Sequence, residues 1–445
     1  MGFLLRADDA GIEVHTEAPG ALTTLRGDTG GTTVIVHGDL LDPAFTVPAG
    51  ISADVHAGLG PAFARYCAAT VTDDAATLWT DHGALCPLLY TRDRTGALLV
   101  ATSAAALLAR LDRPVQLVDG PRQPGRTGFA GVSAVPAGTV VTVPLHAHAA
   151  ADIVAYFPLP TSVPMPAHRA VRHVGAGLTA AVAHLLRDRN TAAVLLSGGV
   201  DSSTVAALAR PHLTRLSSYT VGTCYGDEFG AARQVATLLG TEHTELLLTA
   251  ADLDRLLPRM IRLLETWQLD TLRIAAPMCF ALDQVRGRED MLLTGYGADL
   301  LFAGLGGDVG TIEQTLRAGV TATGCSNEFS PALAEDDRIL VRHPYWAADM
   351  ITAALTVPAR WKLRDGTVKW VLRQVAAQRL PAEVAHRPKL AIQDGTAMHR
   401  LFADVLGTGD AHTQTERLRR IADTVFTASH PPEGDTHAHL AGLAT

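Results

Sequence analysis

The segment TAAVLLSGGVDSSTVAALAR, residues 191 to 210, constrains the fold more than any other part of the chain. Its apolar run AVLLS is typical of a short buried strand, and we expect a helix from about residue 202. Between them stand two glycines, one acid and three hydroxyl side chains, which is more than a plain turn requires. A strand that passes through such a loop into a helix is typical of a parallel sheet, which binds ligands at the carboxyl ends of its strands.

The residues around this segment alternate between helical and strand-like patterns. Residues 168–187 carry apolar side chains at helical spacing, SSYTVG (217–222) and TELLL (244–248) read as strands, and a helix is expected from Phe229 to Gly240. Such alternation predicts a parallel sheet covered by helices on both faces. From about residue 252 onward we expect mostly helix.

The first part of the chain has a different pattern. Strand-like runs occur at residues 32–38, 76–83 and 96–102, and a proline-rich stretch, 157–170, with four prolines, interrupts both periodicities. A chain of 445 residues exceeds what one hydrophobic core usually supports. We therefore predict a strand-rich domain over residues 1–165 and an α/β domain over residues 166–445.

Composition excludes several classes of protein. The formal charge of −8 argues against a nucleic-acid binder, and there is no run of about 18 apolar residues, so we expect no membrane span and no export. Five scattered cysteines without a CxxC pair are typical of reduced thiols in a cytoplasmic protein. The eighteen histidines form no HExxH motif and are expected to be solvated. The composition does not decide whether the protein forms a homo-oligomer.

The loop at residues 197–203 has the features of a phosphate site. Glycines let the backbone approach an anion, successive N–H groups can point at it, and the following helix offers its positive end. An acid in such a site would repel phosphate unless a cation is present, so Asp201 predicts Mg²⁺. The alternative is a glycine-rich turn that merely caps a helix. The candidate phosphate ligands are Ser197, Gly198, Gly199, Ser202 and Ser203.

SGGVDSS resembles the PP-loop of the ATP pyrophosphatases, which cleave ATP between its α- and β-phosphates. Five further strings resemble motifs of the asparagine synthetase family and follow one another in an ordered series. That resemblance implies an N-terminal vestigial Ntn-glutaminase-like αββα domain, a C-terminal parallel-sheet PP-loop domain with extra helices, and the cofactors ATP and Mg²⁺. The strings are DEFGAARQVATLLGTEH (227–243), LLTGYGAD (292–299), VRHPYW (341–346), LRDGTVKWVLRQVA (363–376) and RPKLAIQDG (387–395).

One departure from that family concerns the glutaminase half. The family's glutaminases use an N-terminal cysteine as nucleophile, whereas this chain begins Met1, Gly2, Phe3 and its first cysteine is Cys67. Glycine has no side chain that could attack an amide. We therefore expect the first domain to act as a scaffold or in partner contact and not to release ammonia from glutamine.

A second departure is Tyr296, where asparagine synthetases usually have Glu in the sequence GEGAD. Together with NEFSP (327–331), it makes the chain similar to β-lactam synthetase and carbapenam synthetase. The resemblance implies that Tyr296 and Glu328 form a catalytic dyad and that Lys389 stabilises an oxyanion. The chemistry is coherent, because an attacking amine must lose a proton and a phenol needs a carboxylate to become a base.

The same resemblance assigns other residues. Asp299 becomes the second Mg²⁺ ligand beside Asp201, and Lys369 holds pyrophosphate; we place Leu196 and Gly295 with them in the nucleotide site. Considered singly, each residue has a simpler interpretation: a packed aromatic for Tyr296, a surface acid for Glu328 and solvated lysines for Lys369 and Lys389. Only the surrounding motifs favour the functional interpretation.

These residues predict an enzyme that adenylates a small amino-acid-derived carboxylate and closes a lactam with an internal amine, releasing AMP and pyrophosphate. The first alternative changes the acceptor and is a lasso-peptide-type macrolactam cyclase or an intermolecular amide ligase. It stays open because AIQDGT (391–396) differs from the GVHEGS-like string associated with β-lactam synthetase. The second alternative is a non-catalytic ATP-binding scaffold.

Overall fold

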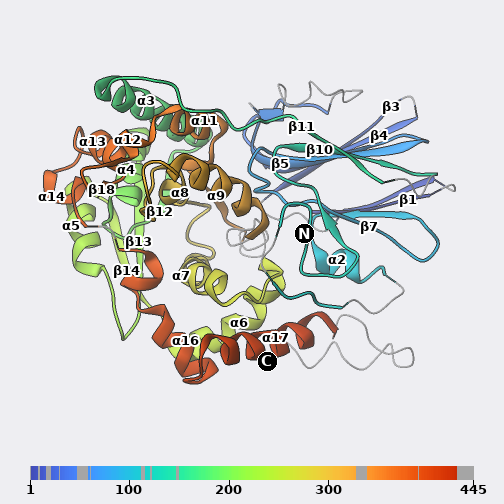
Figure 1. Cartoon of the computed structure of the whole chain (residues 1–445). Helices are drawn as coiled ribbons and strands as arrows, with labels where there is room; N and C mark the ends of the chain where they lie inside the picture. The colour runs from blue at the N-terminus through green and yellow to red at the C-terminus, as the bar shows by residue number, and fades with distance from the viewer. Residues whose placement is uncertain are drawn as a thin grey trace.

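The computed structural model describes residues 2–8, 11–16, 22–29, 31–47, 59–60, 62–111, 116–120, 123–146, 150–326, 338–388 and 390–427. Figure 1 shows two parts side by side, a β-rich part built from the first 155 residues and an α/β part built from the rest. The domain boundary near residue 165 stays a prediction.

Two antiparallel sheets form the β-rich part. The first has the strand order β2-β1-β8-β7-β9, and the second has the order β11-β10-β6-β5-β4-β3. Buried side chains from both sheets, such as Leu5 and Leu78, belong to one hydrophobic cluster, so the sheets face each other. The strands are β1 (Phe3–Asp8), β2 (Gly11–Thr16), β3 (Thr23–Thr29), β4 (Thr32–Leu40), β5 (Phe63–Val71), β6 (Ala75–Thr80), β7 (Leu89–Arg92), β8 (Leu98–Ala101), β9 (Ser133–Ala134), β10 (Thr139–Pro144) and β11 (Asp152–Ala155).

Two facing sheets fit the inner layers of the predicted αββα arrangement. The outer helical layers stay a prediction, although α2 (Ala104–Leu108) does pack on the first sheet. Position 2 has no room for a side chain: Gly2 has a φ of +86°, and a Cβ there would lie 2.0 Å from Thr102 Oγ1. The packing around residue 2 therefore favours glycine.

The α/β part contains a five-stranded sheet with the order β14-β13-β12-β15-β16, in which all pairs are parallel, as the alternation predicted. The strands are β12 (Thr191–Leu195), β13 (Arg215–Gly222), β14 (Glu242–Leu247), β15 (Met291–Leu293) and β16 (Leu340–Arg342). β15 and β16 lie in the region where we expected mostly helix. Each has three residues, too few to show a strand period.

Helices cover both faces of this sheet. Val194 of β12 packs in one hydrophobic cluster with α3, α4, α5, α11 and α13, and Ala193 packs in another with α6, α7, α16 and α17. The left-handed Gly240, with a φ of 64°, ends α5, as its position predicted. The helices are α3 (Ala167–Leu186), α4 (Val200–Ala209), α5 (Phe229–Leu239), α6 (Ala250–Leu264), α7 (Leu269–Val285), α8 (Ala298–Leu301), α9 (Ile312–Ser326), α11 (Ala348–Thr356), α12 (Ala359–Lys362), α13 (Trp370–Ala376), α14 (Ala382–Ala385), α15 (Ile392–Gly395), α16 (Met398–Leu406) and α17 (Ala411–Thr427).

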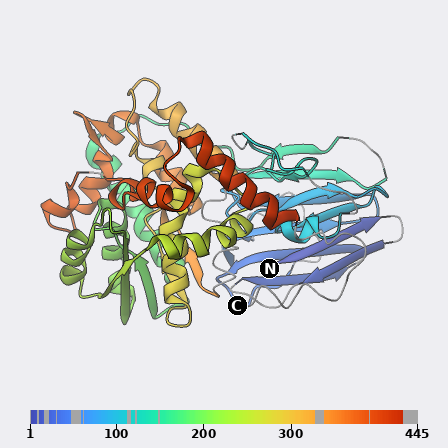
Figure 2. The same cartoon turned by 90° about the horizontal axis from the view of Figure 1, so that it is seen from below.

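A buried ion pair joins the two parts. Nε and Nη2 of Arg342, on β16, each donate at 2.8 Å to the carboxylate of Asp39, on β4. Both side chains are at most 1% exposed, and Arg342 also pairs with Asp188 at 2.8 Å. Figure 2 shows α17 reaching from the α/β part to the β-rich part, where Phe426 packs on Phe129. In the described residues no helix has the length and apolarity that a membrane span needs.

Candidate active site

The loop after β12, where the sequence predicted a phosphate site, contains a glycine in the left-handed conformation. Gly198 has a φ of +71°, and a Cβ at this position would lie 2.5 Å from the backbone carbon of Ala231 in α5. Only glycine fits such a left-handed, crowded position without strain. Gly199 then caps α4, whose amino end faces the carboxyl edge of the sheet. This arrangement suits an anion.

The hydroxyl groups of the loop are bonded within the loop itself. The N–H groups of Ser197 and Gly199 donate to Ser202 Oγ at 3.2 Å and to Ser197 Oγ at 3.3 Å. We had expected these N–H groups to point at the anion, so a bound phosphate would have to take over the two donors. Ser203 differs from the other two serines, because it is buried in α4 and does not line the cavity described next. Its placement favours packing over a phosphate contact.

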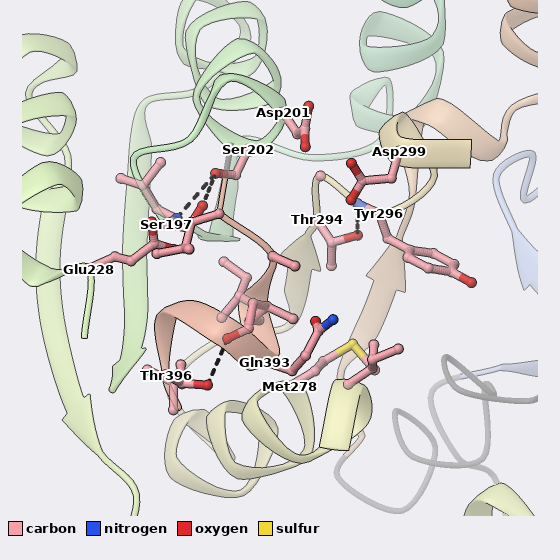
Figure 3. Close-up of a pocket in the computed structure, with 18 of the residues that line it drawn as sticks. Ser197, Asp201, Ser202, Glu228, Met278, Thr294, Tyr296, Asp299, Gln393 and Thr396 are labelled. Carbon is pink, nitrogen blue, oxygen red and sulfur yellow. Dashed lines mark hydrogen bonds between the residues drawn. The ribbon is translucent and has the colours of Figure 1, made fainter. Parts of the chain in front are cut away.

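A cavity of about 360 Å³ opens at the carboxyl edge of the sheet. Figure 3 shows Asp201 and Ser202 on one side of it and Met278 and Gln393 across from them, on α7 and α15. The described residues that line it include most of the predicted nucleotide site. They are Leu195, Leu196, Ser197, Asp201, Ser202, Thr220, Val221, Glu228, Ile274, Met278, Thr294, Gly295, Tyr296, Gly297, Asp299, Leu300, Leu305, Leu390, Ala391, Ile392, Gln393 and Thr396.

Two carboxylates on the cavity wall converge on one lysine. Nζ of Lys369 lies 2.6 Å from Oδ1 of Asp299 and donates to Oδ2 of Asp201. The lysine side chain is 1% exposed, whereas Asp201 and Asp299 are 23% and 36% exposed. The three residues come from α4, α8 and the residue before α13, so only the tertiary fold brings them together.

The backbone around Lys369 is specialised for this contact. Burial lowers the pKa of Lys369, but the charges of Asp201 and Asp299 outweigh that effect and the pKa is raised, so the ammonium form is favoured. Lys369 has a φ of +58°, an uncommon left-handed conformation for lysine. A Cβ on Gly304 would lie 1.8 Å from Asp299 Oδ1 and 2.4 Å from Lys369 Cε. The cluster therefore requires glycine beside it.

The donor set suits a hard cation that also binds phosphate. Asp201 and Asp299 supply carboxylate oxygens, the ligands that Mg²⁺ prefers, and both reach the cavity. Within the described ranges no group of three or more histidine, cysteine or acidic side chains gathers that could hold a metal alone. Two carboxylates fit Mg²⁺ that takes its other ligands from phosphate oxygens and water.

Tyr296 follows β15 and lines the same cavity, but its ring does not face the phosphate loop. Figure 3 shows the ring extending away from Ser197 and Ser202. The ring packs on His343 and Trp346, with centroids 5.6 and 5.8 Å away. The phenol and the phosphate loop therefore lie on different sides of the site.

A buried hydrogen-bonded pair supports the start of this turn. Thr294 Oγ1 lies 2.7 Å from His343 Nδ1 and accepts a 3.2 Å hydrogen bond from the backbone N–H of Tyr296. Burial, with a smaller contribution from the Arg65 guanidinium, lowers the pKa of His343 to about 3, so its imidazole is neutral at pH 7. His343 is thus a core histidine, which corrects the expectation that the histidines are solvated.

Sequence reasoning missed an ion pair beside the loop. Arg387 Nη2 lies 2.9 Å from Glu228 Oε1, and Arg387 Nη1 donates at 3.0 Å to the carbonyl of Ser197. Burial raises the pKa of Glu228, and Arg387 partly offsets this rise. Both residues stand in strings that we compared with the asparagine synthetase family, but nothing local indicated that they meet.

Two predicted catalytic residues, Glu328 and Lys389, lie outside the described residues. Their roles therefore stay predictions. Gly295 does lie against the loop: a Cβ on it would lie 2.7 Å from the backbone nitrogen of Ser202. Leu196 lines the cavity beside it.

The parallel sheet, the glycine-rich loop and the acid–lysine cluster define a nucleotide-binding α/β protein. The asparagine synthase family profile matches residues 173–309 and 334–430, which span the sheet and the cavity. The chain belongs to the asparagine synthase family.

Individual relatives agree with this assignment. A carboxyethyl-arginine β-lactam synthase from Streptomyces clavuligerus is 33% identical over 390 residues, which cover 85% of this chain and 75% of that protein. A glutamine-hydrolysing asparagine synthetase of Arabidopsis thaliana is 28% identical over 231 residues, 45% of this chain and 39% of that protein. These relationships support an ATP-dependent, amide-forming ligase. The solved NMN synthetase of Francisella tularensis aligns at 11% identity over 61% of this chain and 100% of its own, with a TM-score of 0.31, too low to support a conclusion.

Proposed function

We propose that this ligase adenylates a substrate carboxylate and then closes a lactam by attack of an amine in the same molecule. The observation that carries the proposal is the convergence of Asp201, Asp299 and Lys369 at the end of the phosphate loop, in the cavity that Tyr296 also lines. The similarity to a β-lactam synthase over most of both chains supports ring closure in particular.

In the first step the substrate carboxylate attacks the α-phosphorus of ATP, the bond to the β-phosphate breaks and pyrophosphate leaves. Asp201 and Asp299 would hold Mg²⁺, which when bound supplies positive charge to the phosphates. Lys369 keeps its ammonium charge in the buried cluster and offsets the charge of the departing pyrophosphate. The loop N–H groups of Ser197 and Gly199 orient the phosphate chain.

In the second step the amine nitrogen attacks the acyl carbon, the carbon–oxygen bond to AMP breaks and the amine loses a proton. Tyr296 is the proposed base, with Glu328 as its proposed partner. Since the phenol lies on a different side of the site from the loop, the substrate would present its adenylated carboxyl toward the loop and its amine toward Tyr296. Tyr296 then has no part in the first step.

Product analysis tests this proposal. With ATP, Mg²⁺ and a single amino acid that carries both a carboxylate and a β-placed amine, we expect AMP, pyrophosphate and a product lighter than the substrate by one water. Mass spectrometry identifies that product. A requirement for a second, separate amine, or for a peptide substrate, would replace ring closure by the ligase or macrolactam alternative.

A further inference from the structure

The part of the cavity across from the phosphate loop is apolar. Ile274 and Met278 project from α7 and Ile392 comes from α15, while Leu300, also in the lining, follows Asp299 on α8. Figure 3 places Met278 on the far side of the cavity from Asp201 and Ser202. The nucleotide has its own apolar residues next to the loop, Leu195, Leu196 and Val221 among them. The second apolar group is therefore left for the other substrate.

Two leucines continue this apolar surface to the mouth of the cavity. Leu305 is 73% exposed and Leu390 is 52% exposed, although both line the cavity. Large apolar side chains held in water beside an enclosed polar site are typical of a surface that a ligand covers. An aliphatic group placed against them would remove apolar area from water, which favours binding.

The acidic side chains on the described cavity wall already form ion pairs with basic side chains. Glu228 pairs with Arg387 at 2.9 Å, and Asp201 and Asp299 converge on Lys369 and face the proposed phosphate and Mg²⁺ site. Across from the two aspartates the described polar lining includes neutral groups: Gln393 is an amide, and Thr396 Oγ1 donates at 2.7 Å to the carbonyl of Ile392. Among the described residues that line this part of the cavity, a guanidinium would meet no carboxylate that is free of another partner.

We infer that the carboxylate substrate carries an uncharged aliphatic side chain, bound against Ile274, Met278, Leu300, Leu305, Leu390 and Ile392. This inference rests on the proposed function and narrows it, because the β-lactam synthase relative is named for an arginine derivative, whose side chain is charged. Residues 390–392 overlap the segment in which this chain differs from the string associated with β-lactam synthetase, so the difference in sequence falls where the side chain would bind.

Two substrates that differ only in their side chain test the inference. N-(2-carboxyethyl)-L-leucine and N-(2-carboxyethyl)-L-arginine have the same reacting groups, and carboxylate-dependent exchange of pyrophosphate into ATP is measured with each. We expect kcat/KM to favour the leucine compound by at least about tenfold, the usual discrimination of an apolar pocket. Equal or better use of the arginine compound would overturn the inference and leave the proposed function standing. Exchange with neither compound would overturn both.

Variants at the cavity mouth test whether Leu305 and Leu390 contact the side chain of the substrate. Leu390→Glu and Leu305→Glu place a carboxylate where the side chain would lie, and we expect each to lower the leucine-to-arginine ratio of kcat/KM by about tenfold with the KM for ATP nearly unchanged. The matched control is Leu238→Glu, at a leucine of α5 that is 49% exposed and does not line the cavity. A ratio unchanged in both mouth variants, or changed equally in the control, would contradict the assignment of this surface.

Discussion

Nζ of Lys369 lies 2.6 Å from Oδ1 of Asp299 and also donates to Asp201, which places one buried ammonium between two acids on the wall of the cavity. Replacing the lysine leaves those acids close together without a counter-charge. We expect Lys369→Met to lower pyrophosphate exchange by at least about a hundredfold. The free energy of unfolding should fall by about 2 kcal/mol, less than for a fully buried pair because both carboxylates reach solvent. Exchange kinetics and urea unfolding measure the two effects.

A methyl group beside this cluster should have a similar effect without changing any charge. In Gly304→Ala the new Cβ would lie 1.8 Å from Asp299 Oδ1, so the acid must move away from the lysine. We expect a loss of exchange of more than tenfold. Gly230→Ala, in α5 with no atom within 4 Å of its Cβ position, is the control and should keep full exchange. Equal activity of the two variants would contradict the assigned role of the cluster.

The phosphate loop offers a comparison between neighbouring glycines. Gly198 has a φ of +71° and its Cβ would lie 2.5 Å from backbone in α5, whereas Gly199 has a φ of −76° and its nearest neighbour would be Ser197 Oγ at 3.2 Å. Gly198→Ala should weaken ATP binding by about a hundredfold or more, because the loop must rearrange. Gly199→Ala should stay within about tenfold of the parent protein. Calorimetric titration with ATP in the presence of Mg²⁺ compares them.

Tyr296→Phe separates the two proposed steps. Because the ring extends away from the phosphate loop, we expect pyrophosphate exchange within about threefold of the parent protein. Formation of the cyclic product should fall by about 10²–10⁴-fold, the usual contribution of a general base. Tyr90→Phe, in β7 of the β-rich part, is the control and should change neither rate. Equal loss of exchange and of cyclisation would contradict the role of base.

His343 should make stability depend on pH. Its pKa is lowered to about 3 in the folded protein, from an ordinary value of 6.5, by burial and by Arg65. Between these values the unfolded chain binds one more proton, so the stability that the neutral imidazole confers is present above pH 6.5 and is lost as the pH falls. The slope should reach about 1.4 kcal/mol per pH unit, and His343→Gln should remove it. Urea unfolding at pH 5 and pH 7 measures the difference; an unchanged slope in the variant would contradict it.

Local signals in the sequence predicted the elements well where they were long. The helical spacing of residues 168–187 predicted α3, and Gly240 predicted the end of α5, because in each case the signal lies within a few turns of the helix itself. Strands β15 and β16 escaped prediction, since three residues in a fully covered parallel sheet show no alternation.

For the site too, the sequence predicted some residues, whereas other contacts became known only from the structure. Gly198 could be assigned from its own loop, and resemblance pointed to Asp299 and Lys369. No sequence pattern, however, indicated that Lys369 is buried against Asp201, 168 positions away, or that His343 lies beneath Tyr296. Those relationships come from the packing of β15, β16 and α13 around the sheet, which only the tertiary structure contains.

The central claim is that ATP is cleaved between its α- and β-phosphates to activate a carboxylate. Incorporation of labelled pyrophosphate into ATP, measured with and without a carboxylate substrate, tests it most directly. We predict exchange that requires both the carboxylate and Mg²⁺ and that is lost in Lys369→Met. Release of ADP and inorganic phosphate in place of AMP and pyrophosphate, or tight ATP binding without any exchange, would contradict the claim.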